Sequence, residues 1–115
     1  MDEKILKLLF DIKIAIDEIE SFFATENKIF SNYRQNTLLK RAIERNLEII
    51  GEATNRICKL NQDFKIDNSS RIISLRNHII HSYDSISDEN IWSIVINHIP
   101  RLKIEIENKI HNSTL

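Results

Sequence analysis

The sequence predicts an all-α fold, a four-helix up-down bundle with a short third helix. Glycine and proline occur once each among the 115 residues, and sandwiches, barrels and hairpin-rich folds need turn residues far more often. Long segments place aliphatic residues at alternating steps of three and four, which is the spacing of one helix face. A chain of this length is expected to be a single domain, residues 1–115, with one hydrophobic core.

The first helix is expected to span about 22 residues from the start of the chain. Its inward positions are Ile5, Leu9, Ile12, Ile16, Ile19 and Phe23. A polar stretch around Thr25–Gln35 should interrupt the helical pattern. A second long helix then follows and ends near Leu60, with an apolar stripe made of Leu39, Ile43, Leu47, Ile50, Thr54 and Ile57.

The third helix is predicted to be short, from about Arg71 to Tyr83, with one of residues 68–70 as its N-cap. Ser87, followed by two acidic residues, is expected to cap a fourth helix. Pro100 falls inside that helix and should kink it, because the proline ring removes one backbone donor. The inward positions of the fourth helix are Ile91, Val95, Ile99, Leu102, Ile106 and Ile110.

Composition limits the possible partners. The formal net charge is −1, so a nucleic-acid role would need a local basic patch. Arg41, Arg45, Arg56 and Lys59 give the second helix a basic edge, although interspersed glutamates make a solvated face an equal interpretation.

The single cysteine excludes an internal disulfide and any Cys-pair zinc motif. No apolar run reaches the length of a membrane span, so we expect a cytoplasmic protein without a membrane partner.

The densest polar cluster is the segment Arg76–Asp84. A solvated helix end is one interpretation. The other is chemical: the guanidinium of Arg76 matches phosphate oxygens, and the imidazole of His81 transfers protons near neutral pH. Together they suffice for metal-free RNA cleavage by the ribose 2′-OH, which needs proton transfer and charge stabilisation. His78 and His81 alone make a weak metal-ligand pair, so no metal or cofactor is predicted.

The spacing within this cluster sets a geometric constraint. On an ideal helix, at about 100° per residue, Arg76 and His81 point about 140° apart, whereas Arg76 and Tyr83 differ by about 20°. One ideal helix therefore does not bring Arg76 and His81 to the same phosphate. Either the helix unwinds by His81, or two copies combine their residues, for which a homodimer is the economical solution.

The pattern Arg76-x4-His81-x-Tyr83, placed before a helix with an acidic first turn, resembles the HEPN-domain proteins of the HepT-like group. These are the toxin half of HEPN/MNT (type VII) toxin–antitoxin modules. The resemblance extends to the segment Arg45–Ala53 on the second helix and to Pro100 on the last, so it covers essentially the whole chain.

The resemblance implies a dimeric HEPN bundle that acts as a metal-independent endoribonuclease on tRNA or mRNA. By position, Arg76 and His81 would be the catalytic pair, and Asn77 and His78 would help to position substrate. The implied partner is an MNT-type nucleotidyltransferase antitoxin, which transfers AMP from ATP to Tyr83 and silences the nuclease. The alternative is a catalytically silent HEPN subunit that binds substrate or nucleotide for a nucleotidyltransferase; the presence of both Arg76 and His81 favours the nuclease.

Five further residues carry expectations. Gly51 costs a helix interior about 1 kcal/mol relative to alanine, so we expect a close helix–helix approach there. Glu52 is either a polar helix position or part of the rim of the cleft. Trp92 is expected in the core or the dimer interface rather than stacked on RNA. His98 and His111 are expected to be solvated.

Overall fold

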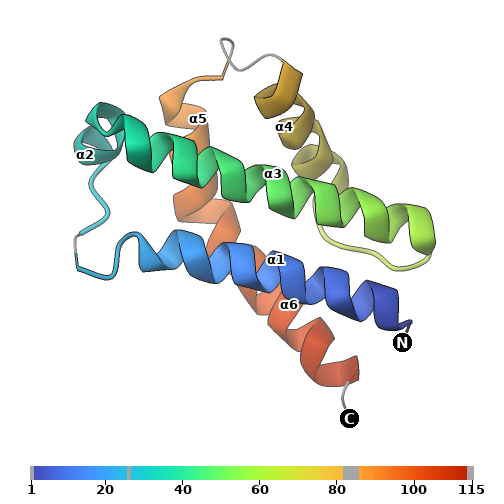
Figure 1. Cartoon of the computed structure of the whole chain (residues 1–115). Helices are drawn as coiled ribbons and strands as arrows, with labels where there is room; N and C mark the ends of the chain where they lie inside the picture. Colours follow the sequence, from blue (N-terminus) through green and yellow to red (C-terminus); the bar gives the residue numbers. More distant parts are fainter. Residues whose placement is uncertain (1, 26, 82–85, 114–115) are drawn as a thin grey trace.

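The computed structural model describes residues 2–25, 27–81 and 86–113, and its regular structure is helical throughout these ranges, which confirms the all-α prediction. The helices form two layers (Figure 1). One layer holds α1 (Glu3–Ser21) and the antiparallel α3 (Thr37–Leu60); the other holds α4 (Ser69–His81) and the C-terminal helix. The shortest dimension is 19 Å, about two helix diameters. Within the described ranges, no helix has both the length and the apolar character needed to cross a bilayer.

Polar side chains cap the helices. Oδ1 of Asp2 accepts from the backbone N–H of Lys4 at 2.7 Å and begins α1. Ser87 caps α5 (Asp88–Ser93) as predicted, because its Oγ accepts from the N–H of Asn90 at 3.1 Å. The third predicted helix, α4, begins two residues earlier than expected. Asn68, just before it, has a φ of 61°, a left-handed conformation that asparagine tolerates better than most residues.

The core lies between α1 and α3 and continues against the C-terminal helix. Most of the predicted inward positions are buried, among them Leu9, Ile12 and Ile16 on α1 and Ile43, Leu47, Ile50 and Ile57 on α3. Phe23, Leu39 and Ile110 are partly buried and pack against this core. Asn46 is a buried polar residue between the two helices, and its amide donates to Oε1 of Glu18 and to the carbonyl of Ala42. The helical spacing therefore identified the core correctly.

The segment expected to be a polar interruption contains a further short helix, α2 (Phe30–Gln35), and this part of the prediction is wrong. Tyr33 of α2 is fully buried, with its ring centroid 5.3 Å from that of Trp92. Phe30 and Phe23 also lie against Trp92. This aromatic cluster holds α2 on α5, and Trp92 is partly buried and packs against the core.

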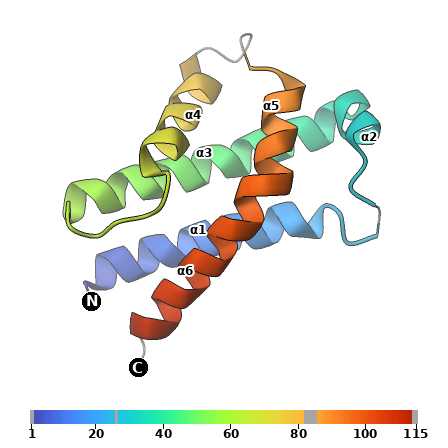
Figure 2. The ribbon, with the colours of Figure 1, turned by 180° about the vertical axis from the view of Figure 1, so that it is seen from behind.

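The C-terminal helix changes its hydrogen-bond pattern before Pro100. After α5 comes a π-helical segment, η2 (Ile94–His98), in which the N–H of Ile99 donates to the carbonyl of Ile94. α6 (Ile99–Ser113) then continues. Proline lacks an N–H and its ring collides with the carbonyl four residues earlier, so the wider π-turn absorbs the conflict. The helix changes direction between α5 and α6 (Figure 2), so the distortion expected at Pro100 is present.

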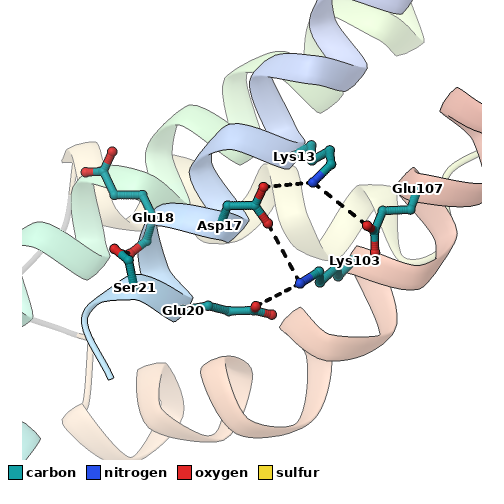
Figure 3. Close-up of polar contacts among 7 residues, drawn as sticks. All are labelled: Lys13, Asp17, Glu18, Glu20, Ser21, Lys103 and Glu107. Carbon is teal, nitrogen blue, oxygen red and sulfur yellow. Dashed lines mark hydrogen bonds and ion pairs between the residues drawn. The ribbon is translucent and has the colours of Figure 1, made fainter. Parts of the chain in front are cut away.

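A chain of ion pairs joins α1 to α6 (Figure 3). Lys103 of α6 lies 2.8 Å from Glu20 and 3.8 Å from Asp17 of α1. Lys13 of α1 lies 2.8 Å from Asp17 and 3.8 Å from Glu107 of α6. The hydrogen bond to Asp17 raises the pKa of Lys13, and that to Glu20 raises the pKa of Lys103. The side chains in these pairs are 30% to 46% exposed. Exposed ion pairs add little to the free energy of unfolding, so their main effect is to orient α6 against α1.

The buried tyrosine provides a test of the core. The Tyr33 hydroxyl is buried without a hydrogen-bond partner among the described residues, and an unsatisfied group of this kind costs about 1–3 kcal/mol. We therefore expect Tyr33→Phe to leave the free energy of unfolding unchanged or to raise it by up to about that amount. Tyr33→Ala, which removes the ring, should lower it by about 3–5 kcal/mol. Urea unfolding followed by circular dichroism measures both.

Tyr33→Phe should also change how the stability of the protein depends on pH. Burial, together with the charges of Asp88 and Glu44, raises the pKa of Tyr33 above its usual range. A pKa that is higher in the folded than in the unfolded state lowers the free energy of unfolding at high pH. The contribution of Tyr33 is fully present below the unfolded pKa of about 10 and is lost as the pH rises above that value. Tyr33→Phe should reduce this alkaline loss. A Tyr33→Phe protein that is clearly less stable at pH 7 would show that the hydroxyl has a partner.

Candidate functional site

The site begins where α4 crosses α3 at Gly51 (Figure 1). A Cβ atom on Gly51 would overlap the Cβ of Arg76, and would lie 2.9 Å from the Cγ of Arg76 and 3.2 Å from the carbonyl oxygen of Ile72. The first carbons of Arg76 therefore rest on the bare backbone of α3. This confirms the close helix–helix approach expected at Gly51.

The guanidinium of Arg76 is held by two neighbours. Its Nη2 forms an ion pair with Oε2 of Glu52 at 2.8 Å, and its Nη1 donates to Oδ1 of Asn77 at 3.0 Å. Oε1 of Glu52 also accepts from Nε of Arg56 at 2.9 Å. Glu52 is therefore part of the site and not simply a polar helix position. Its link to both arginines was not evident from the sequence, because Arg76 lies 24 positions away on another helix.

Arg76 lies at the edge of a groove of about 250 Å³ formed by α1, α3 and α4. Asp11 of α1, Glu52 and Arg56 of α3, and Ile80 of α4 line the same groove. Nε of Arg76 is buried without a partner among the described residues. A guanidinium has five N–H donors, so the contacts to Glu52 and Asn77 leave one donor on each terminal nitrogen. This pair is what a bidentate phosphate contact uses.

His81 does not share this groove. α4 remains a regular α-helix through His81, so the interpretation in which the helix unwinds before that residue is excluded. Arg76 and His81 keep the divergence of about 140° that an ideal helix gives. His81, His78 and Asn77 are exposed, whereas only 26% of the Arg76 side chain is exposed. Tyr83 lies outside the described residues.

The basic edge expected on α3 is largely neutralised. Arg41 pairs with Glu44 at 3.0 Å, and Arg45 pairs with Glu48 at 3.3 Å. Each pair lies on the exposed side of the helix, so this face is better described as solvated ion pairs than as a continuous track for a nucleic-acid backbone.

A second cavity, of about 380 Å³, separates α4 from η2 and α6. Aliphatic side chains form much of it, including Leu47 of α3, Leu75 of α4 and Leu102 of α6. His98 of the π-helical segment lines this cavity and is partly exposed. His111 is exposed, as expected.

Within the part of the chain that the structure describes, no group of three or more His, Cys, Asp or Glu side chains is arranged to hold a metal ion. Cys58 is partly buried.

Comparisons with known proteins find ribonuclease relatives of this chain. The family model described as "Ribonuclease HepT-like" matches residues 12–108. "Putative RNase MJ1380" of Methanocaldococcus jannaschii is 34% identical over 103 residues, which cover 86% of this chain and 90% of that protein. "Putative RNase MJ0127" of the same organism is 35% identical over 107 residues, covering 89% and 84%. "Putative RNase TTE0752" of Caldanaerobacter subterraneus is 30% identical over 82 residues, covering 68% and 70%. No solved structure gives a significant match.

The crossing at Gly51 can be tested by mutation. Alanine is favoured over glycine in a helix by about 1 kcal/mol, but the added methyl group would overlap Arg76 and force α4 away. Overpacking of this kind costs about 1–3 kcal/mol or more, so we expect Gly51→Ala to lower the free energy of unfolding. Asn55→Ala, one turn further along α3, is the control and should be neutral or slightly stabilising. A stabilised Gly51→Ala protein would show that α4 is not held at this distance.

Proposed function

Because this chain belongs to the HepT-like ribonuclease family, we propose that it is a metal-independent endoribonuclease that cleaves tRNA or mRNA, with Arg76 and His81 as its catalytic pair. The observation that supports this proposal most directly is how the Arg76 side chain is packed and oriented. Its stem is fixed against Gly51, its guanidinium is oriented by Glu52 and Asn77, and it retains a donor on each terminal nitrogen.

The chemistry follows from these groups. The 2′-OH of a ribose attacks the adjacent phosphorus, the bond from phosphorus to the 5′ oxygen of the next nucleotide breaks, and a 2′,3′-cyclic phosphate and a 5′-OH result. One proton must leave the 2′-OH and one must reach the 5′ oxygen, and an imidazole near neutral pH can perform either transfer. Arg76 would stabilise the negative charge that grows on the phosphate oxygens. Asn77 and His78, exposed on the same helix, would help to position substrate.

We further propose that the active form is a homodimer in which Arg76 of one copy and His81 of the other act on the same phosphate. The divergence of the two side chains on a regular helix supports this. The packing of α4 supports it as well. Only Ile79 of α4 is buried, although the helix carries four other aliphatic residues. We expect the interface to include the third and fourth helices predicted from the sequence, and the cavity lined by aliphatic residues lies between these two helices, α4 and η2–α6.

The family also suggests regulation as a toxin–antitoxin pair. We propose that an MNT-type nucleotidyltransferase transfers AMP from ATP to Tyr83. The chain has two tyrosines, and Tyr33 is fully buried in the aromatic cluster, where no transferase could reach it in the folded protein. This leaves Tyr83 as the acceptor. An AMP group there would add about one negative charge per phosphodiester close to the catalytic motif and would oppose RNA binding.

The catalytic pair is tested by single substitutions. Arg76→Ala and His81→Ala should each lower the rate of RNA cleavage by about 10²–10⁴, because one removes charge stabilisation and the other proton transfer. Cleavage by the unchanged protein should persist in excess EDTA. Far-UV circular dichroism checks that the variants remain folded. Full activity in either variant would reject the catalytic assignment.

Mixing the two inactive variants tests the shared site. In a symmetric dimer with sites shared between copies, a heterodimer has one site that lacks both groups and one that is intact. Because half of the dimers in an equal mixture are heterodimers, activity should return to about a quarter of the original level. If each site were formed within one chain, the mixture would stay inactive. A monomer by sedimentation with full cleavage activity would also contradict the proposal.

The regulatory proposal predicts a change in mass. Incubation with the partner nucleotidyltransferase, ATP and Mg²⁺ should add one or more AMP units and stop RNA cleavage. Tyr83→Phe should show no added mass and should keep cleaving RNA after this treatment. Tyr33→Phe is the matched control and should be modified like the unchanged protein. Equal modification of Tyr83→Phe in intact-mass spectra would place the acceptor elsewhere.

A further inference from the structure

Two arginines share one carboxylate at the edge of the groove. Arg41 and Arg45 each have a glutamate of their own on α3. Arg56 and Arg76 instead both contact Glu52, at 2.9 Å and 2.8 Å. The three side chains together carry two positive charges and one negative charge. This trio therefore keeps a net positive charge, unlike the Arg41–Glu44 and Arg45–Glu48 pairs on the same helix.

We propose that Glu52 is a positioning residue, which fixes Arg76 at the groove and holds Arg56 beside it, so that the two guanidinium groups form one binding site for an RNA phosphate. The proposal rests on the proposed function, in which Arg76 contacts the substrate phosphate. It adds a second phosphate-binding group, Arg56, and gives Glu52 a role in the reaction.

The exposures of the three side chains suggest different roles for the two arginines in binding and catalysis. The Arg56 side chain is 64% exposed, Glu52 37% and Arg76 26%. An approaching polyanion therefore meets Arg56 first, and Arg56 contributes to binding at all stages of the reaction. Arg76 lies deeper, and its first carbons pack against the backbone at Gly51. A group held in this way is suited to stabilising charge that appears only in the transition state.

Glu52 has two opposite effects on the substrate. Its negative charge repels the phosphate in the ground state. Its ion pair with Arg76 orients the guanidinium in advance, so that less reorganisation is needed when the charge develops. Loss of the carboxylate charge should therefore improve binding and impair the chemical step. A residue that served only to hold the fold together would not separate these two quantities.

The kinetics of variants that each remove one charge test this separation. Glu52→Gln should lower kcat by about tenfold or more while KM stays equal or falls. Arg56→Gln should raise KM by about tenfold with kcat within about twofold, and should reduce the salt dependence of binding by about one phosphate contact. Glu44→Gln is the matched control: it frees Arg41 on the same helix and should leave kcat and KM within about twofold.

Binding of a non-cleavable 2′-deoxy oligonucleotide is a second readout that does not depend on turnover. Glu52→Gln should bind it as tightly as the unchanged protein or more tightly, and Arg56→Gln should bind it about tenfold more weakly. Weaker binding by Glu52→Gln, or kinetics equal to those of Glu44→Gln, would overturn this inference while Arg76→Ala stays inactive. An unchanged protein that does not cleave RNA, or an active Arg76→Ala, would instead reject the proposed function.

Discussion

The close crossing of α3 and α4 at Gly51 is the constraint on which the site depends. Because glycine has no Cβ, the stem of Arg76 lies directly on the α3 backbone, and the next residue on α3, Glu52, is then within reach of the guanidinium. A single missing methyl group thus sets both the spacing of two helices and the direction of a charged side chain. The local cost of glycine in a helix, about 1 kcal/mol, is offset by a geometry that a larger residue would prevent.

In the monomer, α4 packs against one neighbouring helix and leaves apolar surface uncovered. α4 packs mainly on α3, and a cavity of about 380 Å³ separates it from η2 and α6. The result is a helix with Arg76 at a groove on one side, aliphatic residues at a cavity on the other, and His81 exposed at its end. In the proposed homodimer, a second copy would cover apolar surface and supply His81, which diverges from Arg76 within one chain.

The features of the fold and the site that depend on nearby residues in the sequence were predictable from it. Helical spacing identified the buried positions of α1, α3 and α6, Ser87 was identified as a cap from its acidic neighbours, and Gly51 was identified as a packing site. The missed helix α2 involves a partner distant in sequence. Tyr33 packs against Trp92, 59 residues away, so its segment looked polar on its own. The concentration of Phe22, Phe23, Phe30 and Tyr33 in a short segment was the available signal for α2.

The distribution of charge narrows the kind of RNA recognition that this protein could use. With a formal net charge of −1 and glutamates paired to Arg41 and Arg45 along α3, no broad positive surface is available there to attract an RNA backbone over many nucleotides. The two arginines that share Glu52 carry a local surplus of positive charge, whereas Arg41 and Arg45 are each paired with one glutamate. A focal site of this kind neutralises few phosphates, and the salt dependence of affinity scales with their number. Under the proposed mechanism, selectivity would come from the shape of the RNA around one phosphate, because a ribose 2′-OH aligned for attack occurs most readily where a strand is unpaired and can be bent into the groove.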